Sequence, residues 1–131
     1  MKSFLDTNIL VRHLTGDPPA QAKRATAFLA AAGHELILAD LILAEMVYVL
    51  ESYYGHPRGQ VAEASRSLLA LPSVAASDHE LLLRAVELYE GERLDFADAY
   101  VCAAAELSGV GAVASFDRSI DRVPTVRRVQ P

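Results

Sequence analysis

The sequence predicts an α/β fold in which a mostly parallel sheet of four to five strands is flanked by helices. Short apolar runs of strand length alternate with longer helical segments along the whole chain, which is typical of βα units. The 131 residues suffice for one domain with a real hydrophobic core but not for two. Hydrophobic residues make up 52% and charged residues 22%, as in globular proteins. We therefore expect a single domain over 1–131.

Apolar runs and flanking turn residues predict the strands and helices in order. Strands are predicted at 3–5, 35–39, 73–76, 112–114 and 125–129. Helices are predicted at 8–14, 20–32, 41–54, 59–71, 78–90 and 96–107. The first strand is expected to be central in the sheet.

Capping residues set the expected helix boundaries. Asp17 precedes Pro18-Pro19 and is expected to cap the second helix, while Asp40 is expected to cap the third. The segment Ser77-Asp78-His79-Glu80 has the spacing of a capping box. Glycines or prolines follow the predicted helix ends, at Gly33, Gly55, Pro72, Gly91 and Gly109.

The charge and the cysteine content limit the possible functions. The chain carries 12 basic residues and 17 acidic ones, which gives a net charge of −5. This charge argues against general electrostatic binding of nucleic acid over the protein surface. Cys102 is the one cysteine, and its apolar neighbours indicate a buried side chain. No secretory signal or membrane span is visible, so we expect a cytoplasmic protein.

Four acids occupy positions that suggest one site. Asp6 directly follows the first predicted strand and Asp117 comes just after a later one, where open α/β sheets place their chemistry. Glu45 and Asp98 lie within apolar helical segments, where an unpaired carboxylate is costly. Four converging carboxylates need a cation to stay ionised. The acids therefore predict a metal site.

Each acid also has a simpler interpretation. Asp6 and Asp117 could cap the helix and the turn that follow them. Glu45 could lie at the edge of its apolar stripe, and Asp98 could be a surface acid. Asp95 is expected to be an N-cap more readily than a ligand.

The ligand types favour a hard cation. Carboxylates without an accompanying cysteine or histidine pair indicate Mg²⁺ or Mn²⁺ rather than zinc. The four histidines are scattered with no i, i+4 pairing: His13, His34, His56 and His79.

Four motifs in order resemble those of the PIN-domain family, and within it the VapC-type toxins of bacterial type II toxin–antitoxin pairs. They are Leu5-Asp6-Thr7-Asn8, Leu43-Ala44-Glu45, Asp95-Phe96-Ala97-Asp98-Ala99 and Ser115-Phe116-Asp117. The resemblance covers essentially the whole chain. It implies a three-layer fold, endoribonuclease activity with Mg²⁺ or in its place Mn²⁺, a homodimer, and inhibition by a small cognate antitoxin.

The matching positions carry over as catalytic residues: Asp6, Glu45, Asp98 and Asp117. The resemblance also implies supporting residues: Thr7 and Asn8, which would hydrogen-bond the first acid, Asp95, and Ser115, where the family often has threonine. The expected reaction is hydrolysis of an RNA phosphodiester by a metal-activated water.

Within that reaction we expect Asp6 and Asp98 to contact the metal directly. Glu45 and Asp117 would hold metal-bound waters or a second ion. Three arginines near the acid motifs are candidate phosphate contacts: Arg12, Arg118 and Arg122.

Two other functions fit the sequence less well. A phosphatase or phosphoryl acceptor with Asp6 as its nucleophile needs a dedicated lysine, and the chain has only Lys2 and Lys23. A catalytically inactive module that binds RNA or protein would not need an acidic pocket, and clustered carboxylates lower the stability of the fold.

Overall fold

The computed structural model describes residues 1–131 and has an α/β fold with six α-helices and five strands. The chain divides into two compact units, Met1–His79 and Glu80–Pro131. All strand pairings are parallel: three strands form one sheet and two form a second, smaller sheet. The α/β class is therefore confirmed, whereas the single domain over 1–131 stays a prediction.

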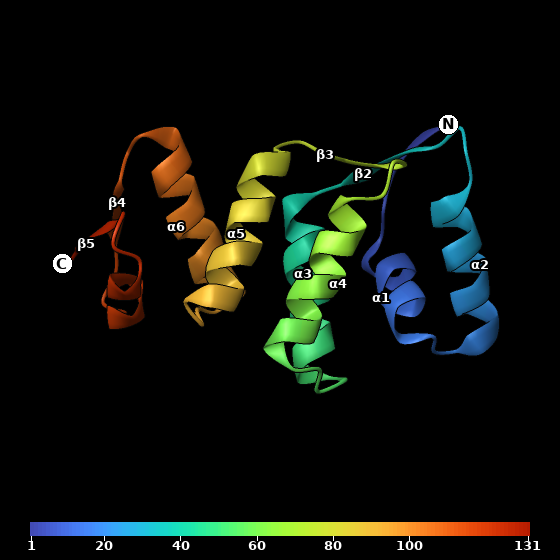
Figure 1. Ribbon diagram of the computed structural model, residues 1–131, viewed down its shortest axis with the longest axis horizontal. Helices are drawn as coiled ribbons and strands as arrows, with labels where there is room; N and C mark the ends of the chain where they lie inside the picture. Colours follow the sequence, from blue (N-terminus) through green and yellow to red (C-terminus); the bar gives the residue numbers. More distant parts are fainter. The chain divides into compact units, whose positions relative to one another are not determined.

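The first unit is built around the three-stranded sheet, in the order β1-β2-β3 (Figure 1). Its elements are β1 (Lys2–Phe4), α1 (Thr7–Thr15), α2 (Pro19–Ala30), β2 (Glu35–Leu38), α3 (Asp40–Ser52), α4 (Arg58–Leu69) and β3 (Val74–Ala76). Helix α1 packs against α2 and α3, and α3 packs against α4. The central strand β2 buries Leu36 and Leu38 completely.

Helix α3 shows why the apolar spacing predicts it. Leu43, Met46, Val47 and Leu50 recur at helical spacing and all are buried. Each such side chain gains about 1.5–3 kcal/mol on leaving water. This buried face fixes which way the other side chains of α3 point.

The second unit contains α5 (His79–Gly91), α6 (Phe96–Ser108), β4 (Ala112–Ala114), a 3-10 turn at Arg118–Arg122 and β5 (Arg127–Val129). Strands β4 and β5 pair in parallel, with Ala112 opposite Arg127. Arg84 on α5 donates from Nε and Nη2 to the two carboxylate oxygens of Glu106 on α6, at 2.8 and 2.9 Å. This bidentate ion pair ties α5 to α6.

Several details differ from the sequence prediction. Within the three-stranded sheet of the first unit, β1 lies at one end of the strand order and pairs with β2 alone, whereas the sequence predicts a central strand. Pro18, not Asp17, occupies the N-cap of α2, and Ala39, not Asp40, that of α3. Both actual cap residues have an extended backbone, and neither offers a side-chain cap bond.

Two other expectations concern single features. Cys102 is fully buried, as predicted, and this burial raises the pKa of its thiol. None of the helices is both long and apolar enough to span a lipid bilayer.

Candidate acidic site

Asp6 sits between the end of β1 and the first turn of α1. It occupies the N-cap position with an extended backbone, φ −92° and ψ 152°, but its side chain accepts no cap hydrogen bond. The carboxylate is exposed. The Asp6 carboxylate is therefore not used to cap the helix, and it remains accessible to solvent and to a ligand.

Glu45 is held by a residue of α1. The buried Thr7 donates from its hydroxyl to Glu45 Oε2 at 2.8 Å, which links α1 to α3. The resemblance implies that Thr7 supports the first acid, but in the structure its hydroxyl bonds the second one. Asn8 makes no hydrogen bond with its side chain and lines a neighbouring pocket.

The face of α3 that carries Glu45 is exposed. Leu41, one turn before Glu45, has 77% of its surface exposed, and Tyr48, one turn after, has 68%. The interpretation that Glu45 reaches solvent beside the apolar stripe is thus confirmed. One carboxylate oxygen bonds Thr7 and the other is available.

In the second unit, Asp98 and Asp117 lie together. Asp98 is half-buried in the first turn of α6, and Asp117 follows β4. Asp117 Oδ1 accepts the backbone N–H of Ser119 at 2.9 Å, so its predicted capping role is confirmed. Its own N–H donates to Ser115 Oγ at 2.9 Å, which gives Ser115 a supporting contact. Asp117 lies close enough to Asp98 for the charge of each carboxylate to affect the other.

Burial and neighbouring charge separate the pKa values of these two acids. Burial raises the pKa of Asp98, and the charges of Asp117 and Asp95 raise it further. The pKa of Asp117 is lowered, first by its hydrogen bonds from Ser119, and also by the charge of Arg122. Asp98 therefore lies where negative charge is in excess.

Asp95 contributes charge but no cap bond. It occupies the N-cap position of α6, as the simpler interpretation predicts, yet its side chain makes no cap hydrogen bond. Its charge helps to raise the pKa of Asp98.

A divalent cation suits the Asp98–Asp117 pair. Mg²⁺ keeps several waters and takes one or two carboxylates, so these two residues are chemically sufficient for it. Neither unit by itself brings together three or more His, Cys, Asp or Glu side chains that could hold a metal ion. The expected convergence of Asp6 and Glu45 with Asp98 and Asp117 involves both units and stays a prediction.

Two features of the first unit were missed in the sequence. The bond from Thr7 to Glu45 joins residues 38 positions apart, and no local pattern signals it. A pocket between α1 and α2 is lined by Arg24 and Gln21 as well as Arg12. The signal for it is the spacing of Gln21, Arg24 and Phe28 on one face of α2.

Comparison with protein families gives a match. A family model described as PIN domain matches residues 3–126, nearly the whole chain. PIN domains are generally nucleases, and these nucleases typically use divalent metals. No curated protein matched the chain.

Proposed function

This chain belongs to the PIN domain family, and from that premise we propose that it is a metal-dependent endoribonuclease, the toxin of a toxin–antitoxin pair. The observation that supports this most is the state of Asp98. Its pKa is raised by burial and by two neighbouring carboxylates, which is the electrostatic setting that a bound cation relieves.

The proposed roles of the acids follow from their positions. Asp6 and Asp98 would bind the ion directly, with Glu45 and Asp117 holding waters of its shell. Mg²⁺ is the proposed cofactor, and Mn²⁺ can replace it. A bound divalent ion lowers the pKa of water and offsets charge that develops on phosphate oxygens.

The chain's own residues orient this chemistry. Thr7 fixes Glu45 through Oε2 and leaves Oε1 available to accept a hydrogen bond from water. Ser119 and Ser115 fix the Asp117 turn from both sides. Two positioned carboxylates thus stand on separate rigid supports, which limits the reorganisation needed during the reaction.

We predict that cleavage of RNA requires Mg²⁺ or Mn²⁺ and leaves 5′-phosphate and 3′-hydroxyl ends. Water is the expected nucleophile, because no histidine pair is placed to make the RNA's own 2′-hydroxyl attack. The measurement is a metal-titrated cleavage assay on RNA with analysis of the product ends, beside the variant Asp6→Asn. Full activity in excess chelator, or a cyclic 2′,3′-phosphate end, would contradict the mechanism.

We predict a homodimer in solution. Leu41 and Tyr48 on α3 and the nearby Tyr53 are 77, 68 and 81% exposed, so three large side chains close in the sequence offer apolar surface that a second copy could cover. Sedimentation at micromolar concentration should give about twice the monomer mass of 14.1 kDa. A single species at the monomer mass at all concentrations would contradict this prediction.

We also predict that a small cognate antitoxin inhibits the enzyme by placing a basic side chain at the acidic site. A cluster of carboxylates attracts a guanidinium, which can bond a carboxylate bidentately. The antitoxin would direct an arginine or lysine toward Asp6, Asp98 and Asp117. Replacing that residue by glutamine should restore RNA cleavage in the complex more than it weakens assembly, with cleavage and affinity measured on the same samples. Complete inhibition by the altered antitoxin would instead indicate steric occlusion.

A further inference from the structure

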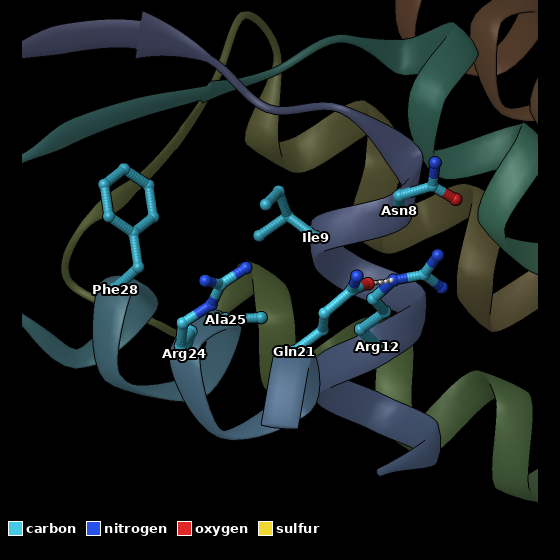
Figure 2. Close-up of a pocket in the computed structure, with 7 residues that line it drawn as sticks. All are labelled: Asn8, Ile9, Arg12, Gln21, Arg24, Ala25 and Phe28. Carbon is cyan, nitrogen blue, oxygen red and sulfur yellow. Dashed lines mark hydrogen bonds between the residues drawn. The ribbon is translucent and has the colours of Figure 1, made fainter. Parts of the chain in front are cut away.

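The pocket between α1 and α2 combines cationic, amide and apolar side chains within the first unit. It has a volume of about 450 Å³, within the range of about 300–1,000 Å³ that is usual for small-ligand sites. Figure 2 shows the two guanidiniums on either side of Gln21, with Asn8 above Arg12 and with Ile9 and Phe28 on the side of Arg24.

The two arginines of the pocket are not neutralised by acids. Arg12 Nε donates to Gln21 Oε1, which orients its guanidinium and leaves the terminal nitrogens available. Arg24 makes no hydrogen bond or ion pair. By contrast, Arg84 and Arg128 are paired with carboxylates. In a chain with a net charge of −5, two unpaired guanidiniums in one pocket mark a site for an anion.

The remaining lining fits a nucleotide better than a simple anion. Phe28 and Ile9 offer an apolar surface for a base, and the Phe28 ring is supported by His34 at a centroid distance of 4.5 Å. The amides of Asn8 and Gln21 can both donate and accept hydrogen bonds, as base edges and 2′-hydroxyls require. Guanidiniums bind phosphate through paired N–H groups.

The pocket also lies beside the candidate acids of its own unit. Asn8 belongs to the first turn of α1, directly after Asp6 and Thr7. A strand bound along α1 would therefore lead toward the carboxylate that begins this helix. A single-stranded RNA meets all of these requirements.

We propose that this pocket binds one nucleotide of the RNA substrate, with its phosphate on Arg24 and its base against Ile9 and Phe28, while Arg12, on the other side of Gln21, binds the neighbouring phosphate. The proposal deepens the proposed ribonuclease function and rests on it, because it assigns the place where substrate is held rather than cut.

The test measures RNA binding without cleavage. The protein carries Asp98→Asn and is kept in excess chelator, and the anisotropy of a labelled single-stranded RNA reports the affinity. Arg24→Gln and Arg12→Gln are compared with Lys23→Gln, which removes the same charge from the exposed residue next to Arg24 that does not line the pocket. Thermal melting checks that each variant is folded.

We expect Arg24→Gln to weaken binding about tenfold or more, the effect of losing one charge-assisted hydrogen bond. The salt dependence of binding should also fall by about 0.7 in log–log slope. The RNA affinity of Arg24→Lys should lie between that of the protein with Arg24 and that of Arg24→Gln. Lysine keeps the positive charge but lacks the planar guanidinium with its paired N–H groups. Lys23→Gln should change the affinity less than twofold. With Asp98 restored and Mg²⁺ present, Arg24→Gln should raise KM more than it lowers kcat.

Equal affinity and equal KM in Arg24→Gln and Lys23→Gln would overturn the proposal while leaving the ribonuclease function intact. A variant that keeps RNA affinity but loses binding of a protein partner would also overturn it and would assign the pocket to that partner. If the unaltered protein binds RNA through these arginines but does not cut it with any divalent ion, the pocket stands and the proposed nuclease function fails.

Discussion

Asp98→Asn should abolish RNA cleavage and raise the melting temperature of the metal-free protein. The loss of activity should exceed about 100-fold, since even residues that only support metal ligands contribute about 10–100-fold. The gain in stability has a separate cause. Asp98 is half-buried beside Asp117 and Asp95, so the substitution keeps the shape and removes one of three mutually repelling charges.

The pH dependence of stability gives a second measurement of the same residue. The pKa of Asp98 is higher in the folded protein than in the unfolded chain. Between these two pKa values the folded state binds more protons, so the free energy of unfolding falls as pH rises through this interval. Asp98→Asn should remove this fall, and melting curves in chelator from the ordinary aspartate pKa upward would show it.

A matched control separates the site from general charge effects. Glu51→Gln removes one carboxylate of α3 that lies outside the proposed site and has no ion-pair partner. It should change neither cleavage nor the melting temperature appreciably. If Asp98→Asn behaved like this control, Asp98 would be a surface acid and not a ligand.

The elements of the fold were predictable because they depend on local spacing. Leu43, Val47 and Leu50 predict a helix wherever they are placed in three dimensions, and β4 was predicted at its observed bounds. The helix caps were less predictable. Asp17 is a strong cap residue, but Pro18 already has the extended backbone that must precede α2.

Strand partners and side-chain contacts were not predictable from local patterns. The position of β1 in its sheet depends on which distant strand pairs with it, and residues 3–5 carry no information on that choice. The bond from Thr7 to Glu45 has the same origin. For the acids, sequence position made Asp98 and Asp117 candidates, while only the structure gave their proximity and their opposite pKa shifts.

A double-mutant cycle on Asp6 and Asp98 should show strong coupling. Asp6 belongs to the first unit and Asp98 to the second, and the proposed function requires both carboxylates on one ion. If they share it, removing either ligand already destroys most of the site. The double variant Asp6→Asn/Asp98→Asn should then bind Mn²⁺ hardly more weakly than the weaker single variant.

Metal affinity is the better readout for this cycle, because the cleavage rates of the single variants are expected to be too low to compare. Glu51→Gln, a carboxylate of α3 outside the proposed site, serves as the control partner: combined with Asp98→Asn it should have no effect of its own. Losses that multiply for Asp6 and Asp98 would mean that the two acids hold separate ions that bind independently. If Asp6→Asn instead lowers cleavage while leaving Mn²⁺ affinity unchanged, the ion is held by Asp98 and Asp117 alone, and Asp6 acts on the RNA and not on the metal.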